Sequence, residues 1–479
     1  MTTNKYALLS AAALAAAAFV GQAQAAATIV INNINAAGVG FNDATPAAPI
    51  GGNSGTTLGQ QRLIAFTHAA NIWGATLTSS QPIVINAQFT ALTCTASSAT
   101  LGSAGATSVF RDFANAPKSG TWYSYALANK LSGSYLGTAN AAQINARFNV
   151  NLGNTGCLDG TRWYLGLDGN HGTDIDFVVT LLHEMGHGIG FQTFTNGSTG
   201  AFLSDGVNGY PAAWDHYLTD ASTGLTWAQS TASQRAASAL SVDKLVWNGP
   251  IVNNEIPNVL RQGNPGLIVS GAASGASAGN YAVGEASFGP ALSTTPLVGQ
   301  IMPVVTSTGT LDLACNALTG NSALAVKNNI ALVSRGTCGF AIKVKNAQNA
   351  GAIGVLIADN APGAPAGMSG TDPTITIPSV RIEQATGVKL LTALAKRSRT
   401  SSGVVATLGI VGTRYSGADA QGRMMMYAPA TFASGSSVSH FDTTATRNLL
   451  MEPAISGDLT HNVIPPYDLT FRLLQEIGW

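Results

Sequence analysis

The chain has 479 residues, enough for about three domains at roughly 150 residues each. Charged residues make up only 10% of it, and Lys+Arg and Asp+Glu both number 23, so the formal net charge is zero. No basic surface for nucleic acid is therefore expected. The hydrophobic fraction of 46% also argues against intrinsic disorder. These values predict a folded, multidomain protein that does not bind nucleic acid.

Residues 1–25 have the pattern of a secretory signal peptide. Lys5 precedes an apolar run from Ala7 to Val20, and Ala23-Gln24-Ala25 is a small-x-small cleavage site. The apolar run is shorter than the roughly 20 residues that span a bilayer, and no later segment reaches that length. The sequence therefore predicts a secreted, extracellular protein that is cleaved near Ala25 and has no membrane span.

The segment that follows predicts a mixture of helix and sheet. Apolar side chains recur every three or four residues after Thr57, which predicts a helix capped by Thr56 or Thr57. Alternating apolar and polar side chains predict short strands at residues 28–32, 83–89, 144–150 and 162–167. Between residues 205 and 290 the patterns are too weak to place elements. The expected fold class is α/β (α+β).

A second predicted helix carries a metal-binding pattern. Thr173 or Asp174 caps it, and it contains His183-Glu184-Met185-Gly186-His187. Two imidazoles one turn apart on the same helix face can coordinate one zinc ion, while the glutamate between them can reach a water molecule on the metal. The sequence therefore predicts a zinc site with His183 and His187 as ligands and Glu184 as the catalytic general base.

A catalytic zinc normally has three protein ligands and one open position, so one more ligand is needed. No glutamate occurs between Glu184 and Glu255, which argues against a nearby glutamate ligand. The remaining candidates are five histidines and one aspartate: His68, His171, His216, His440, His461 and Asp215.

These motifs resemble the leishmanolysin-type branch of the metzincin zinc proteases. The resemblance rests on four short blocks, at residues 183–191, 439–442, 448–453 and 468–479. In this branch an insertion delays the third histidine, and a methionine in a tight turn lies under the metal. The shorter metzincin pattern is excluded because its third histidine would fall at Thr193. The resemblance implies a metzincin-like catalytic domain in which His440 is the third ligand and Met451, 11 residues later, forms the Met-turn. Asp215 and His216 stay open as alternatives to His440.

Other carboxylates allow two interpretations each. Asp442 either accepts a hydrogen bond from a metal-binding imidazole and so orients the ring, or it is a solvated loop residue. Asp168, Asp174 and Asp176 lie close together near a Gly-rich turn, where they could bind a structural Ca²⁺. Helix capping explains two of these three without an ion.

Residues 291–410 predict a separate α/β module, because short apolar strands alternate with helical patterns. The expected strands are 330–333, 353–358 and 375–382, and the expected helices are 340–350 and 384–395. The run from Ile330 to Phe340 and the segments after it resemble a protease-associated (PA) domain. The catalytic domain would then be discontinuous: residues 1–25 are the signal peptide, 26–290 and 411–479 form the catalytic domain, and 291–410 form the inserted PA domain.

Four cysteines permit three disulfide pairings, and an exported protein meets oxidising conditions. Pairing Cys94 with Cys157 and Cys315 with Cys338 keeps each disulfide inside one proposed domain, so we expect this arrangement.

Together these features predict a secreted zinc endopeptidase that hydrolyses protein or peptide substrates. Zinc would lower the pKa of its water to about 7 and polarise the scissile carbonyl. The alternative is a secreted, non-enzymatic PA-domain binding or surface protein with a vestigial metal site. An intact Glu184 argues against that alternative.

Overall fold

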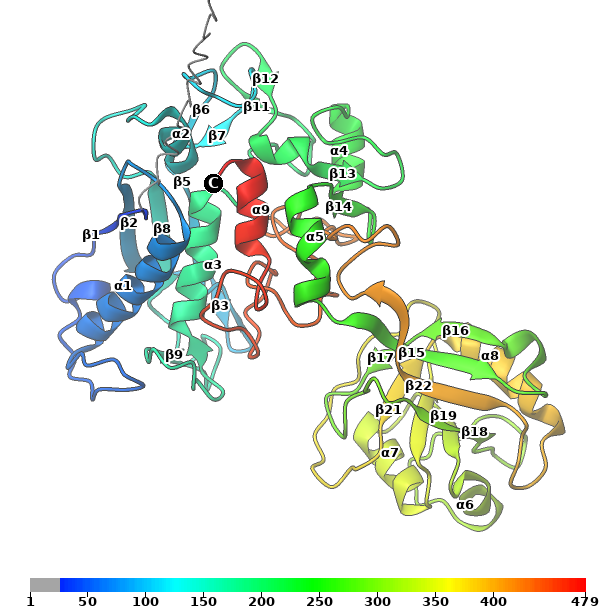
Figure 1. The fold of residues 1–479 in the computed structure, drawn as a ribbon. Coiled ribbons are helices and arrows are strands. Elements are labelled where there is room, and N and C mark those ends of the chain that lie inside the picture. The colour runs from blue at the N-terminus through cyan, green and yellow to red at the C-terminus, as the bar shows by residue number, and fades with distance from the viewer. Residues whose placement is uncertain (1–25) are drawn as a thin grey trace, which may run out of the picture.

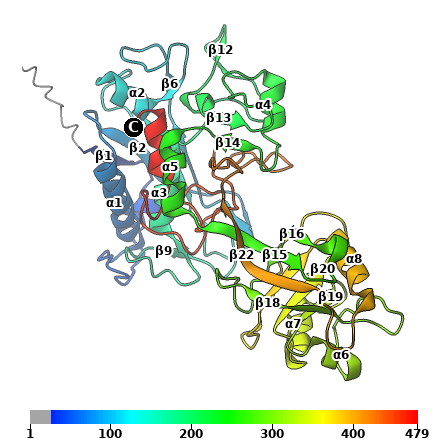
Figure 2. The same ribbon diagram turned by 45° about the vertical axis from the view of Figure 1, so that its right-hand side comes forward.

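The computed structural model describes residues 26–479, so the predicted signal peptide lies outside the described residues. Two lobes are visible in Figures 1 and 2. The chain enters the second lobe through β15 (Gln262–Ser270) and leaves it through β22 (Val405–Tyr415), and these two strands pair antiparallel. The first lobe is therefore built from both ends of the chain.

A four-stranded sheet organises the first lobe. Its order is β1 (Ile29–Asn33), β2 (Ile83–Thr90), β8 (Ile144–Asn149) and β5 (Gly102–Ala106). The first three strands run parallel, and β5 is antiparallel at the edge. Alternate residues of β2 and β8 are buried, as the predicted alternation requires.

Two helices cover the buried face of this sheet, α1 (Leu58–Thr76) and α3 (Phe177–Ile189). As predicted, Thr57 caps α1, because its hydroxyl accepts the amide of Gln60 at 3.2 Å. The predicted caps of α3 were wrong. Asp176 caps it instead, accepting the amides of Val178 at 2.8 Å and Val179 at 3.2 Å.

Smaller elements complete the first lobe, several of them in the region that the sequence left unplaced. Its helices are α2 (Tyr125–Ser132), α4 (Ala232–Ser238), α5 (Pro250–Val259) and α9 (Thr470–Ile477), with 3-10 turns at Gly40–Asn42 and Ala213–His216. Short strand pairs join β3 (Cys94–Thr95) to β4 (Ser98–Ala99), β6 (Val109–Phe110) to β7 (Tyr123–Ser124), β9 (Trp163–Tyr164) to β10 (Ile175–Asp176), β11 (Leu203–Ser204) to β12 (Gly209–Tyr210), and β13 (Leu218–Asp220) to β14 (Leu245–Trp247).

The second lobe is an eight-stranded sheet in the order β16, β15, β22, β18, β19, β20, β21, β17. Its remaining strands are β16 (Gly279–Ala282), β17 (Gly284–Glu285), β18 (Leu297–Pro303), β19 (Ile330–Ser334), β20 (Gly354–Ala358) and β21 (Ser379–Ile382). Its helices are α6 (Gly320–Val326), α7 (Phe340–Asn349) and α8 (Gln384–Ala393), with 3-10 turns at Gly275–Ser277 and Leu394–Lys396. The sheet extends beyond 291–410 at both ends because β15 pairs with β22.

Both faces of this second sheet are covered, which explains the continuous apolar runs of β19 and β20. Leu332 and Leu356 pack in one cluster with Leu390 of α8, whereas Val333 and Val355 belong to a second cluster with α7. The helices thus lie on opposite faces. The long strand expected at 375–382 is reduced to β21, Ser379–Ile382.

Both expected disulfides are present, Cys94–Cys157 in the first lobe and Cys315–Cys338 in the second. Within residues 26–479 no helix combines the length and apolar character needed to cross a membrane.

Replacing the observed cap should destabilise the fold, while replacing a predicted cap should not. Asp176→Ala removes the acceptor of two amides and the partner of His461 Nε2, which lies 2.9 Å from Asp176 Oδ2. We expect a loss of about 1–2 kcal/mol in the free energy of unfolding, measured by urea denaturation. Thr173→Ala is the control and should change it by less than about 0.5 kcal/mol. Equal losses in both variants would contradict the assignment.

Candidate metal centre

Three histidine side chains converge in the first lobe. Two of them are close in sequence, and the third follows 253 residues after the second. His183 and His187 project from α3, and His440 comes from the segment after β22. Nε2 of His440 lies 3.2 Å from Nε2 of His187 and 3.3 Å from Nε2 of His183. Among residues 26–479 this is the group of side chains that could hold a metal ion.

The hydrogen bonds of the other ring nitrogens fix which nitrogen faces the centre. Nδ1 of His183 lies 2.7 Å from the carbonyl of Leu450, and Nδ1 of His187 lies 2.8 Å from the carbonyl of Phe191. Nδ1 of His440 lies 2.8 Å from the Ser436 carbonyl. A carbonyl oxygen only accepts, so each Nδ1 must carry the proton. In the neutral rings, all three Nε2 lone pairs therefore point at one another.

This geometry suits a zinc ion. Two nitrogens that each lie about 2.05 Å from a tetrahedral ion are about 3.3 Å apart. The two Nε2 distances to His440, 3.2 and 3.3 Å, match that value. Three neutral imidazoles are also a donor set that zinc prefers. The residues present therefore fit the metal that the sequence predicts.

Burial favours the neutral form of these rings. It lowers the pKa of His183 to about 4. Burial, together with the neighbouring His183, lowers the pKa of His187 to about 3. The pKa of His440 is also well below its ordinary value, through burial and the other two rings. The lone pairs consequently stay available to a cation at neutral pH.

Glu184 lies between the centre and the edge strand β5. Its side chain is buried, and its carboxylate accepts a hydrogen bond from the backbone amide of Ala104. A Cβ at Gly102 would lie only 2.9 Å from Glu184 Oε1, so a side chain at this position would displace the carboxylate. Burial raises the pKa of Glu184 to about 8, and a bound divalent cation would act in the opposite direction.

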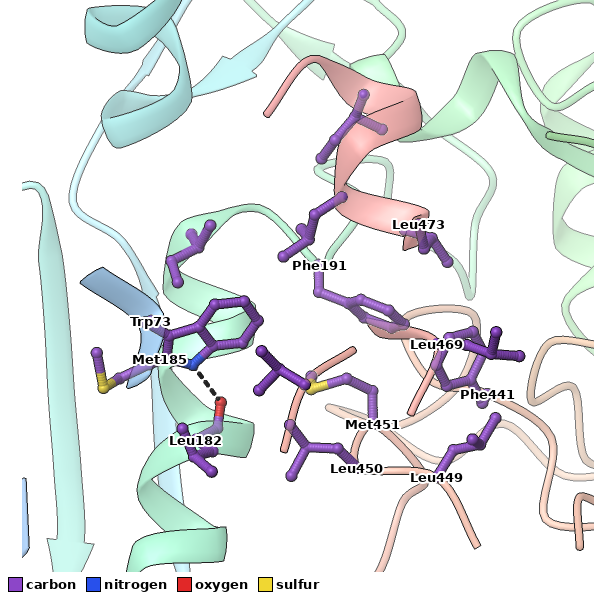
Figure 3. Close-up of a cluster of buried hydrophobic side chains, with 14 of the residues drawn as sticks. Trp73, Leu182, Met185, Phe191, Phe441, Leu449, Leu450, Met451, Leu469 and Leu473 are labelled. Carbon is purple, nitrogen blue, oxygen red and sulfur yellow. Dashed lines mark hydrogen bonds between the residues drawn. The ribbon is translucent and has the colours of Figure 1, made fainter. Parts of the chain in front are cut away.

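Met451 lies against α3 beneath the histidines. Figure 3 shows its sulfur among buried apolar side chains close to Trp73 and Leu450. A Cβ at Gly186, which lies between the two helical histidines, would be 2.8 Å from Met451 Sδ. The Met451 carbonyl accepts the amide of Phe441 at 2.8 Å. One buried turn thus touches all three histidine segments, through Gly186, through the Leu450 carbonyl and through Phe441.

The two alternatives for the third ligand lie elsewhere. Asp215 is fully buried and accepts the hydroxyls of Thr193 at 2.6 Å and Thr195 at 2.5 Å. It also accepts the Ala212 amide at 2.8 Å. His216 Nε2 lies 3.0 Å from the hydroxyl of Thr121. Neither side chain belongs to the histidine cluster.

Asp215 and its neighbour instead hold the segments that carry the histidines. The indole of Trp214 donates to the Val438 carbonyl at 3.2 Å. The hydroxyl of Thr193 donates to Asp215, and the amide of Thr193 donates to Ser439 Oγ at 3.2 Å. Trp214 and Asp215 therefore connect the loop after α3 to the residues that immediately precede His440.

Two other interpretations of carboxylates fail. Asp442 accepts the amide of Thr444 at 3.0 Å and its hydroxyl at 2.5 Å, and every imidazole Nδ1 of the cluster already has a carbonyl partner. Asp168, Asp174 and Asp176, which the sequence allows either as Ca²⁺ ligands or in part as helix caps, have separate partners: Asp168 accepts from Tyr164, Asp174 from the amide of Arg162, and Asp176 caps α3. These three carboxylates do not gather into a cation-binding group in the described chain.

The sequence did not reveal the partners of this site. The three carbonyl acceptors leave no signal, because any residue supplies a carbonyl. The contribution of β5 had one weak signal, the run of small residues Gly102-Ser-Ala-Gly-Ala106. Small residues of this kind mark a close approach of another group to the backbone.

Comparisons with known proteins add one assignment. Residues 294–390 match the PA domain family, so the chain contains a PA domain. No curated protein matches the chain.

Similar solved structures include two aminopeptidases and one subtilisin-like protease. BSAP, a zinc aminopeptidase from Bacillus subtilis, is 23% identical with a TM-score of 0.22 over 33% of this chain and 34% of its own. The aminopeptidase from Aneurinibacillus sp. strain AM-1 is 16% identical, with a TM-score of 0.22 over 42% of each chain. The subtilisin-like protease Apa1 from Pseudoalteromonas sp. AS-11 is 19% identical, with a TM-score of 0.22 over 32% of this chain and 35% of its own. The present chain thus spans well under half the length of these structures.

A methyl group at Gly186 should disturb the turn beneath the histidines. In Gly186→Ala the new Cβ would approach Met451 Sδ to 2.8 Å and Cε to 3.3 Å, and Met451 is fully buried. We expect a loss of about 1–3 kcal/mol in the free energy of unfolding from overpacking, measured by urea denaturation. The double variant Gly186→Ala/Met451→Ala should lose less than the sum of the two single-variant losses, because removing the Met451 side chain also removes the overpacking. A single variant as stable as the wild type would contradict this packing.

The buried carboxyl of Glu184 should make the metal-free protein less stable as pH rises. The folded state keeps the proton up to about pH 8, whereas the unfolded chain releases it near the ordinary value of 4.5. Between these values the folded state binds more protons, so stability falls with rising pH. Glu184→Gln cannot titrate. Its stability relative to the wild type should therefore increase by about 1 kcal/mol per pH unit from pH 6 to 8, measured by urea denaturation in a chelator. A difference independent of pH would contradict the shift.

Proposed function

We propose that this protein is a secreted zinc endopeptidase of the metzincin type. The observation that carries the proposal is the convergence of three Nε2 atoms at 3.2 and 3.3 Å, each on a ring whose Nδ1 is held by a carbonyl. The two disulfides support a role outside the cell. The predicted signal peptide supports export.

In this proposal His183, His187 and His440 hold the zinc ion through Nε2, and Met451 supports them from below. Zinc, when bound, supplies a Lewis acid for the scissile carbonyl and lowers the pKa of water to about 7. Glu184 accepts the proton of the attacking water at its carboxylate and delivers it to the leaving amine. A divalent cation bound beside it would lower the pKa of this buried carboxyl, so that Glu184 could accept the proton at neutral pH.

The substrate would lie along the open edge of β5. This strand ends the four-stranded sheet, so one row of its backbone groups has no strand partner within the described sheet. Glu184 accepts the amide of Ala104 at that edge, which puts the candidate base beside it. An extended peptide can add to such an edge through main-chain hydrogen bonds. A site open along a strand edge suits internal segments of a chain, hence endopeptidase activity.

Three proteins measured together test this proposal: the mature wild type, Glu184→Gln and His440→Ala. We expect the wild type to contain about one zinc ion per chain, as three ligands with an open position require, and to cleave casein and peptides with acetylated N-termini. Glu184→Gln should keep the zinc and lose at least about 100-fold in kcat/KM. His440→Ala should lose the zinc. Metal content is read by atomic emission and cleavage by mass spectrometry.

Three results would count against specific parts of the proposal. Zinc and activity retained in His440→Ala would refute the third ligand. Cleavage restricted to peptides with a free N-terminus would indicate an aminopeptidase instead. A wild type that holds no zinc and cleaves nothing would favour the non-enzymatic PA-domain binding protein.

A further inference from the structure

A hollow of about 520 Å³ lies on the outer face of the four-stranded sheet, beside the edge strand β5. Its polar lining residues are Asn86, Gln88, Ser103, Asn145 and Arg147. Its volume falls in the range of ligand sites in proteins. Nothing in the mechanism above uses it.

The register of the sheet explains why polar side chains line this hollow. Gln88 pairs with Arg147, and Arg147 pairs with Ser103, so these three side chains share one face. Their neighbours Ala87 and Ala146 are buried toward α3 on the other face. The polar row therefore crosses the sheet toward the edge that borders Glu184.

Arg147 is the charged residue of this lining, and its charge is not neutralised by a neighbour. Its Nε donates to Ser103 Oγ at 3.3 Å. Among the ion pairs of residues 26–479, none includes Arg147, and its side chain is exposed. The guanidinium therefore extends along the sheet toward the edge with its terminal nitrogens free to bind an anion.

The hydrogen bonds of β5 show which of its residues face the open edge. The Leu101 carbonyl accepts the Asn149 amide, and the Thr107 amide donates to the Gln143 carbonyl. The backbone groups of the odd-numbered residues therefore point to β8, and those of the even-numbered residues point to the open edge. A peptide added at this edge would place alternate side chains on the outer face, above the hollow. The peptide residue opposite Ser103 would then be in the same row as Arg147.

We infer that this hollow is a substrate subsite that selects an acidic side chain, with Arg147 as the selecting residue. The inference rests on the proposed peptidase function. The added strand would lie two strand spacings from β8, about 10 Å, which an arginine and a glutamate side chain can bridge together. The preferred substrates are therefore peptides with Glu or Asp near the scissile bond.

The test compares three peptides that differ at one position, carrying Glu, Gln or Lys, after the cleavage site of a parent peptide has been mapped. Each position within three residues of the scissile bond is scanned. For one position on the outer face, we expect the wild-type kcat/KM for Glu to exceed that for Gln by about fivefold and that for Lys by more. High salt should reduce these ratios because the site is solvated.

Variants at Arg147 assign the preference to this side chain. In Arg147→Ala the ratio of Glu to Gln should fall to about one, and in Arg147→Glu the Lys peptide should become the preferred one. Arg162→Ala is the matched control: it removes an exposed arginine of the same lobe that is in none of the ion pairs, and it should keep the wild-type ratio. A wild-type ratio in Arg147→Ala would overturn the inference.

Binding without turnover separates this inference from the proposed function. The Glu184→Gln variant should bind the Glu peptide about fivefold more tightly than the Gln peptide by calorimetry, and the double variant with Arg147→Ala should bind both equally. Equal affinities in Glu184→Gln itself would overturn the subsite even if the wild type cleaves peptides. Tighter binding of the Glu peptide together with an inactive wild type would support the subsite and refute the peptidase.

Discussion

The candidate site depends on three hydrogen bonds that turn three imidazole rings inward. Each bond joins an Nδ1 to a main-chain carbonyl, at Phe191, Leu450 and Ser436. A carbonyl cannot rotate away as a side chain can, so the path of the backbone decides where each Nε2 points. Buried lone pairs that face one another near 3.2 Å are unfavourable by themselves. A divalent cation between them would relieve that cost, so the arrangement favours a metal centre over a packed histidine cluster.

The rest of the first lobe keeps those three carbonyls in place. Trp214 and Asp215 connect the loop after α3 to the residues ahead of His440. Val438, which accepts from Trp214, has a positive φ of 67°, a conformation that a β-branched residue adopts only when its surroundings enforce it. The turn around Leu450 is held in turn by Asp468, whose carboxylate accepts the Leu450 amide at 2.6 Å.

The long insertion between His187 and His440 is compatible with this centre because the chain enters and leaves the second lobe through neighbouring strands. β15 and β22 pair side by side, so the ends of the second lobe are already close together (Figure 2). Below them, the Arg261 amide donates to the Thr446 carbonyl at 2.6 Å, and the Ser416 amide donates to the Arg261 carbonyl at 3.0 Å. The position of His440 is therefore set by the first lobe, whatever the length of the chain between the strands.

The sequence by itself determined the local features: the helix that carries His183, Glu184 and His187, the alternating strands, and the strand-helix order of the PA domain. Each of these is encoded by residues a few positions apart, so that periodicity and capping patterns can be recognised in the sequence. The cap Asp176, the role of Asp215 as a hydrogen-bond acceptor, and the approach of β5 to Glu184 were decided only by the tertiary structure. These depend on contacts between segments distant in the chain, on carbonyls that carry no sequence signal, and on burial. The approach of His440 to α3 depends on both the sequence and the tertiary structure. The family resemblance predicted it, and packing around Met451 brings the two segments together.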